Sequence, residues 1–251
     1  MDAAIQTAAR GPFSGFLFRW LGAWVLTTAL SSFLLALFYA LEERHGPRFV
    51  IFLGIAGVLS LPVLGGFLQG IVMRGRLRRS TLWGALTGGG IAIAAASTVV
   101  TVLNLRALWW PVVFRVAFWV DEALGLARPP ADFVGAILAS VLFGSILGGM
   151  QAIVLAPRWW SMAGWIATVS LATVFTGVWL YFWTFSGPVS ALFTDVADLT
   201  PLRGQWRFLP ASVLWAEVAA LCFAVPTGLL MRQLLRRHQR TDAEALIRRF
   251  E

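Results

Sequence analysis

Six long apolar runs constrain the fold of this chain more than any other feature. They occupy residues 21–40, 49–73, 82–103, 133–156, 162–185 and 209–231. A helix of about 20 apolar residues crosses the roughly 30 Å hydrocarbon layer of a bilayer, and each run reaches that length. Only 13% of the residues are charged, well below the share of about 25% in soluble domains. The sequence therefore predicts an all-α membrane protein with six transmembrane helices in one domain, residues 1–240, followed by a tail at 241–251.

A seventh apolar segment, residues 107–120, is shorter and contains Pro111 and Arg115. Arg115 and Glu122 are seven residues apart, which places both side chains on one face of a helix. We therefore expect residues 109–124 to form an amphipathic helix that lies on the outer membrane surface and acts as a lid or a docking element.

Arginine is distributed unevenly between the two sides that six spans define. Thirteen Arg and four acidic residues fall on the side that holds both termini, against seven Arg and seven acidic residues on the other side. Because loops rich in positive charge stay in the cytoplasm, we expect both termini and the tail to be cytoplasmic. The basic residues lie at the ends of the apolar runs, so membrane orientation explains the net charge of +8. We expect no nucleic acid as a partner.

Similar segments recur along the chain and predict three parallel helical-hairpin repeats, each formed by an odd-numbered span and the even-numbered span that follows it. The second and fourth spans close on GGFLQGIVM at 65–73 and GGMQAIVL at 148–155, and the sixth closes on a weaker copy, TGLLMR at 227–232. The odd spans open similarly, with Trp24, Trp83 and Trp165 near their starts. We expect most of the 13 Trp to anchor the spans at the membrane interface.

Small residues spaced four apart form stripes along five of the spans. Residues four apart share one helix face, and small side chains on that face let two backbones approach closely. The stripes are Gly54, Val58, Pro62, Gly66 and Gly70; Gly84, Gly88, Ala92 and Ala96; Ala136, Ser140, Gly144, Gly148 and Ala152; Gly164, Thr168, Ala172 and Thr176; and Ser212, Ala216, Ala220, Ala224 and Gly228. We expect these stripes to form the seams between helices.

The segments 65–83 and 148–165 share a Gly-Gly pair, a Gln, further apolar residues and then a Trp-bearing hairpin. This pattern resembles repeats in uncharacterised bacterial multi-pass membrane proteins. The resemblance implies a location in the bacterial inner membrane and carries no function with it.

Few polar side chains interrupt the spans, and these are the candidate functional residues. Glu217 is the only ionisable residue deep inside a span. An ionisable residue at that depth suggests a proton or cation site. The structural alternatives are that its carboxyl is protonated and neutral, or that it forms an ion pair with Arg115. Gln69 and Gln151 occupy matching places near the ends of two even spans, where they suit hydrogen bonds across helices or the wall of a polar vestibule.

The sequence contains no recognisable catalytic motif. The two His residues, His45 and His238, lie outside the spans, and Cys222 is the only cysteine, so we predict no catalytic residue and no metal site, and the sequence specifies no cofactor. The sequence favours a non-enzymatic accessory or scaffold subunit of a membrane complex. The main alternative is a transporter of a small solute or ion that uses Glu217, and a third is an intramembrane enzyme acting on lipid. The expected partners are the lipid bilayer and other membrane subunits or further copies of the chain.

Overall fold

The computed structural model describes residues 15–74, 76–77, 79–104, 106–124, 130–155, 159–185, 195 and 208–247. These residues form helices and no strand. The helices are α2 (Phe16–His45), α3 (Pro47–Met73), α4 (Ser80–Val99), α5 (Arg106–Leu124), α6 (Ala131–Leu155), α7 (Trp159–Phe185) and α9 (Phe208–Ile247), with a π-helical turn, η1 (Val100–Asn104), after α4.

Six of the described helices are long and apolar enough to cross a membrane, as the sequence predicts. Their apolar segments are Phe16–Phe38, Ile51–Met73, Ser80–Leu103, Ala131–Leu155, Met162–Tyr181 and Pro210–Arg236. The largest differences from the predicted bounds are at the first span, which begins five residues earlier, and at the sixth, which ends five residues later. The chain is therefore an all-α, multi-pass membrane protein.

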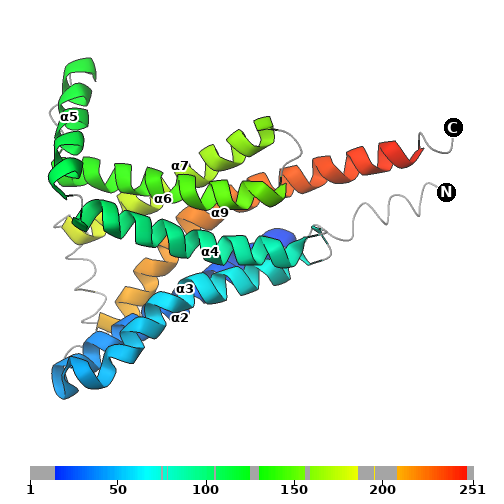
Figure 1. Ribbon diagram of the computed structural model, residues 1–251. Coiled ribbons are helices and arrows are strands. Elements are labelled where there is room, and N and C mark those ends of the chain that lie inside the picture. The colour runs from blue at the N-terminus through cyan, green and yellow to red at the C-terminus, as the bar shows by residue number, and fades with distance from the viewer. Residues whose placement is uncertain are drawn as a thin grey trace.

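The six long helices form a closed ring. Each helix packs against the spanning helix before it and the one after it, and α9 returns to pack against α2. The start of α2 and the C-terminal part of α9 lie at the same end of the bundle, and α9 extends beyond that end (Figure 1). Because α9 continues to Ile247, the predicted boundary between residues 240 and 241 falls inside a helix. The order of the helices around the ring is the one that three hairpins would give, and the repeat itself stays a prediction.

The short helix α5 lies at the end of the bundle opposite the start of α2 and projects away from the long helices (Figure 1). It packs through Val113 and Ala117, both buried, against Val134 of α6. Arg115 and Glu122 are exposed on α5. The helix is thus separate from the six spans, as the interrupted apolar pattern of residues 107–120 predicts.

The seam between α3 and α4 is built from glycine on both sides. A Cβ atom added at Gly66 would lie 2.6 Å from the carbonyl oxygen of Gly84, and one added at Gly88 would lie 2.5 Å from the carbonyl oxygen of Pro62. Such distances leave no room for a side chain, so the two backbones touch directly. The predicted stripes on the second and third spans therefore form the seam in part. Gly54 of the first stripe lies against Phe38 of α2 instead, and Val58 is 60% exposed.

The other predicted stripes have mixed outcomes. On α6, Gly144 and Gly148 lie against the backbone of α7, as expected. Gly164 has nothing within 4 Å of an added Cβ, so the stripe that begins there does not face α6. The close contacts of α7 come instead from Ile166 and Ser170. Glycine spacing alone does not say which face of a helix turns inward.

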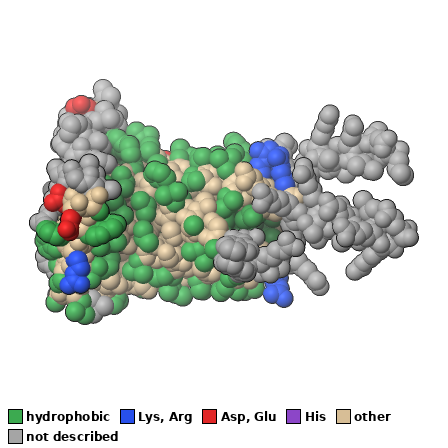
Figure 2. All heavy atoms as spheres, turned by 90° about the horizontal axis from the view of Figure 1, so that it is seen from above, with side chains coloured by type: hydrophobic (Ala, Val, Ile, Leu, Met, Phe, Trp, Pro, Cys, Tyr) green, Lys and Arg blue, Asp and Glu red, His purple; other side chains and the backbone are tan. Residues whose placement is uncertain are grey.

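Charged side chains gather at the two ends of an apolar band (Figure 2). On the face shown, one end carries basic side chains alone and the other end carries both signs. In the loop between α3 and α4, Arg76 donates a hydrogen bond to the Val72 carbonyl oxygen at 2.7 Å and stacks over the Phe16 ring at 5.1 Å. Burial, together with the nearby charge of Arg19, lowers the pKa of Arg76. Arg76 thus connects the end of α3 to the start of α2 at the basic end of the ring.

Candidate functional site

Three buried tryptophans meet inside the ring toward its basic end. Trp20 of α2, Trp83 of α4 and Trp165 of α7 are at most 1% exposed. The ring centroids of Trp20 and Trp83 are 6.5 Å apart and those of Trp83 and Trp165 are 5.8 Å apart, distances typical of aromatic pairs. We call these three residues the tryptophan layer. The expectation that tryptophans serve as interfacial anchors is wrong for all three.

Trp20 takes the place that the repeat pattern assigned to Trp24. Trp24 is also buried, but it packs edge-on against Phe223 of α9 with ring centroids 4.8 Å apart. The two tryptophans are four residues apart and so share one helix face. Sequence similarity could not decide which of them meets Trp83.

The two candidate glutamines lie beside this layer and are each 1% exposed. Gln151 donates a hydrogen bond from Nε2 to Thr87 Oγ1 at 3.0 Å and accepts one at Oε1 from Trp165 Nε1 at 3.2 Å. It therefore ties α6 to both α4 and α7, as predicted for a hydrogen bond across helices. Neither glutamine is among the residues that line the central cavity described below.

Gln69 differs from Gln151 in its hydrogen bonding. Within the described part of the chain, Gln69 Nε2 and Oε1 and the indole Nε1 of Trp83 are buried and have no hydrogen-bond partner. A buried polar group left unpaired costs about 1–3 kcal/mol. The layer thus holds one satisfied glutamine and one unsatisfied glutamine at matching positions of α6 and α3.

A cavity of about 410 Å³ lies inside the ring beyond the tryptophan layer. Thr28 and Thr173 follow Trp20 and Trp165 by eight residues, or about 12 Å along their helices, which places the cavity toward the end where α5 lies. All six long helices contribute to its wall, which is formed by Thr28, Ser31, Ser32, Leu61, Thr98, Ala139, Ser140, Phe143, Thr173, Thr176, Gly177, Leu180, Ala216, Ala219, Ala220 and Phe223.

The wall of this central cavity is apolar with hydroxyl groups set into it. Ser31 donates a hydrogen bond to the Gly57 carbonyl oxygen at 2.6 Å, and Thr173 donates one to the Ser140 carbonyl oxygen at 2.8 Å. These bonds join α2 to α3 and α7 to α6. Thr98 Oγ1 is buried and, among the described residues, has no hydrogen-bond partner. The cavity therefore offers weakly polar walls and a hydroxyl that is not yet paired.

Glu217 lies at the edge of the central cavity, next to the lining residue Ala216. Thr28, which lines the cavity, donates a hydrogen bond to Glu217 Oε1 at 3.1 Å, and Oε2 is buried without a partner among the described residues. The Thr28 hydroxyl also lies 2.9 Å from the Trp24 carbonyl oxygen and has one proton to donate. The hydroxyl proton is therefore shared between the Trp24 carbonyl oxygen and Glu217 Oε1.

The structure does not bring the remaining candidates to this site. Arg115 and Glu122 are exposed on α5, which packs against α6 and η1. Among the described residues, Glu217 has Thr28 as its partner and forms no ion pair with Arg115. Within that same part of the chain, no three His, Cys, Asp or Glu side chains group to hold a metal ion.

The hydroxyl residues of the cavity wall were not predicted from the sequence. Thr28, Ser31 and Ser32 form a short polar cluster in the first span, and this cluster was the available signal. Isolated Ser and Thr are common in spans because they can bond to their own backbone, so single hydroxyls did not stand out.

No family model, curated protein or solved structure matches this chain. A function must therefore be inferred from the cavity, the tryptophan layer and Glu217.

Proposed function

We propose that this protein binds a small amphipathic solute in the central cavity and carries it across the membrane. The observation that carries the proposal is that all six spans line one cavity of about 410 Å³. Small-molecule sites have volumes of about 300–1,000 Å³, mostly apolar walls and a few polar groups that fix orientation. The cavity fits that description, with Thr98 and Thr28 as its orienting hydroxyls.

The tryptophan layer acts as the closed gate in this proposal. In this proposal the layer separates the cavity from the basic end of the ring, and the cavity opens toward the end where α5 lies. Opening the layer costs aromatic packing, and the unpaired amide of Gln69 offsets part of that cost if it gains a partner in the open state. Glu217 takes up or releases a proton as the Thr28 contact changes.

The charge pattern supports an orientation for this carrier. The basic end, where α2 starts and α9 extends beyond the bundle, faces the cytoplasm, and the cavity opens to the outer side. We place the protein in the inner membrane of a bacterium, where it contacts the lipid bilayer.

A binding measurement tests the proposal directly. The purified protein in mild detergent is screened by thermal unfolding against a panel of small amphipathic organic cations, alcohols and fatty acids. A solute that binds the cavity stabilises the wild-type protein, and the effect is lost in Ala139→Phe, whose ring fills the cavity. Val141→Phe on the same helix is the control, because Val141 is 40% exposed on the outside of the bundle. Stabilisation that persists in Ala139→Phe, or no stabilising solute, contradicts the proposal.

Flux through proteoliposomes then tests the role of Glu217. Glu217→Gln keeps the shape and the contact with Thr28 but cannot change its protonation state. We expect solute binding to persist and coupled proton movement to stop. Equal proton movement in the variant removes Glu217 from the mechanism.

A scaffold or accessory subunit is the second candidate, favoured by the exposed apolar side chains of α5. Leu108 and Trp119 are 70% and 64% exposed at the end of the bundle. Gentle purification followed by protein identification tests this alternative. A stoichiometric subunit that is lost in Trp119→Ser supports it, and a monomer without bound protein contradicts it.

A further inference from the structure

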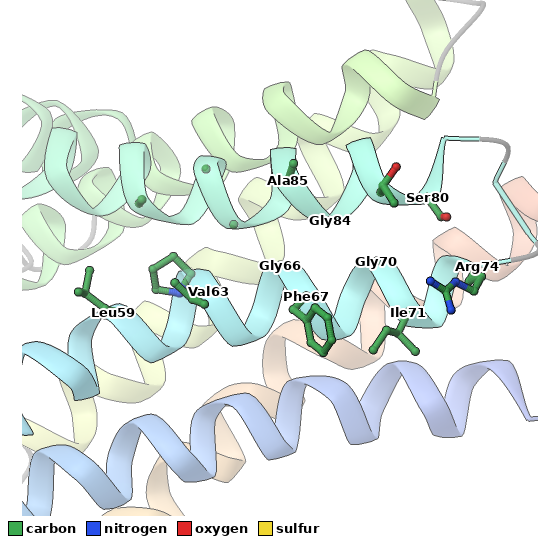
Figure 3. Close-up of a pocket in the computed structure, with 15 residues that line it drawn as sticks. Leu59, Val63, Gly66, Phe67, Gly70, Ile71, Arg74, Ser80, Gly84 and Ala85 are labelled. Carbon is green, nitrogen blue, oxygen red and sulfur yellow. The ribbon is translucent and has the colours of Figure 1, made fainter.

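A second hollow lies on the outside of the bundle, along the seam between α3 and α4 (Figure 3). Its volume is about 580 Å³. Leu59, Val63, Phe67 and Ile71 follow one side of it along α3 (Figure 3). The facing helix α4 contributes only glycine, alanine and small hydroxyl residues, so the surface dips between the two helices.

The polar residues of this groove are confined to one end. Arg74 at the end of α3 and Ser80 and Thr81 at the start of α4 line that end (Figure 3). Arg79, the residue before α4, is exposed, and no side chain caps the first turn of the helix. The first backbone N–H groups of a helix lack partners within it and attract anions. One end of an otherwise apolar groove is therefore positive.

The length of the groove matches one leaflet of a bilayer. It extends along α4 from Ser80 to Ala92, which is about 18 Å at 1.5 Å per residue. Half of a roughly 30 Å hydrocarbon layer is about 15 Å. The polar end coincides with the helix ends, where headgroups lie, and the apolar end stops near the middle of the span. A single acyl chain with its headgroup at the polar end therefore fits the length and the charge of the groove.

We propose that this groove binds one anionic phospholipid of the leaflet at the basic end of the bundle. An acyl chain lies along the glycine-rich floor against Phe67 and Val63. The lipid phosphate lies between the Arg74 guanidinium and the start of α4. Charge complementarity selects an anionic lipid over a zwitterionic one, and the site is independent of the central cavity.

Native mass spectrometry of the full chain in mild detergent tests this proposal. Phosphatidylglycerol and phosphatidylcholine with the same acyl chains are titrated separately, and inorganic phosphate is added as a competitor. We expect one phosphatidylglycerol to bind up to about five-fold more tightly than phosphatidylcholine, since a partly exposed charge contact is worth up to about 1 kcal/mol. Arg74→Gln should remove that preference.

A filling variant separates the groove from general charge attraction. Gly89 lines the groove, and an added Cβ there meets nothing within 4 Å, so Gly89→Leu fills the groove without disturbing helix packing. Gly149 of α6 also has nothing within 4 Å of an added Cβ and lies outside the groove, which makes Gly149→Leu the matched control. We expect Gly89→Leu to weaken phosphatidylglycerol binding at least ten-fold and Gly149→Leu to leave it unchanged.

Three results overturn the proposal. Equal binding of the two lipids removes the charge selection. Equal binding to Gly89→Leu and Gly149→Leu places the lipid elsewhere. Displacement of phosphatidylglycerol by inorganic phosphate at similar concentration shows an anion site that does not use the acyl groove.

Discussion

The glycine seam between α3 and α4 makes a quantitative prediction for Gly84→Ala. The new Cβ would lie 2.6 Å from the carbonyl oxygen of Gly66 and 3.1 Å from the Cα atom of Gly70. Both neighbours are backbone atoms, so no side chain can rotate away. To reach ordinary van der Waals contact at 3.4 Å, the two helices would have to separate by about 0.8 Å. Overpacking of this kind costs about 1–3 kcal/mol.

Replacing glycine by alanine inside a helix also gains about 0.5–1 kcal/mol from the lower flexibility of the unfolded backbone. The net prediction for Gly84→Ala is a loss of up to about 2.5 kcal/mol in the free energy of unfolding. Gly89→Ala on the same helix has no steric cost, because an added Cβ meets nothing within 4 Å. It should be neutral or stabilise the protein by up to about 1 kcal/mol.

Reversible unfolding in mixed micelles of a mild detergent and dodecyl sulfate measures this difference. Tryptophan fluorescence reports on it, since Trp20, Trp83 and Trp165 are buried in the folded state. A gap of about 2 kcal/mol between the two variants is expected. Equal stability of Gly84→Ala and Gly89→Ala would refute direct backbone contact between α3 and α4.

The tryptophan layer gives three further predictions in the same unfolding assay. Gln151→Leu breaks the bonds to Thr87 and Trp165 and should lower the free energy of unfolding by about 1–2 kcal/mol, and an unchanged value would contradict these bonds. Gln69→Leu removes an unpaired buried amide and should leave stability unchanged or raise it by up to about 3 kcal/mol, and a clear loss would mean that Gln69 has a partner. Trp83→Ala leaves a hole beside both other rings and should cost about 3–5 kcal/mol, and a loss below about 1 kcal/mol would contradict its central place.

Several features could be predicted from the sequence because the bilayer leaves few alternatives. A run of about 20 apolar residues has no other stable conformation in lipid than a helix, so the six spans followed from their length. Pro111 and Arg115 interrupt the apolar segment at 107–120, which is too short to cross the bilayer, so the sequence also predicted that this helix lies apart from the spans. The hydrogen bonds between helices that were expected of both glutamines are formed by Gln151, whereas the Gln69 amide is buried without a partner among the described residues.

The orientation of each helix face could not be predicted in the same way. In a soluble helix polar residues mark the outer face, but here lipid and protein interior are both apolar. Trp20 and Trp24 are equally apolar and share a face, and only the packing of α4 and α9 decides which ring meets Trp83. The hydroxyls of the central cavity were missed because isolated Ser and Thr are ordinary span residues: Thr28 bonds to the backbone of its own helix, and the bond from Ser31 to Gly57 of α3 depends on how the helices pack.

Accessibility of single cysteines tests the central claim, which is that the ring encloses a cavity open at one end and closed by tryptophan at the other. Cysteine is placed at Ser32 and Ala139 in the cavity wall and at Ala152, which is 0% exposed in the packed core, all in a Cys222→Ala background. Intact cells and inverted vesicles are labelled with a membrane-impermeant maleimide. We predict rapid labelling of Ser32→Cys and Ala139→Cys from the outer side only, and none at Ala152→Cys. Labelling of the cavity positions from both sides, or from neither, would contradict a cavity with a single open end.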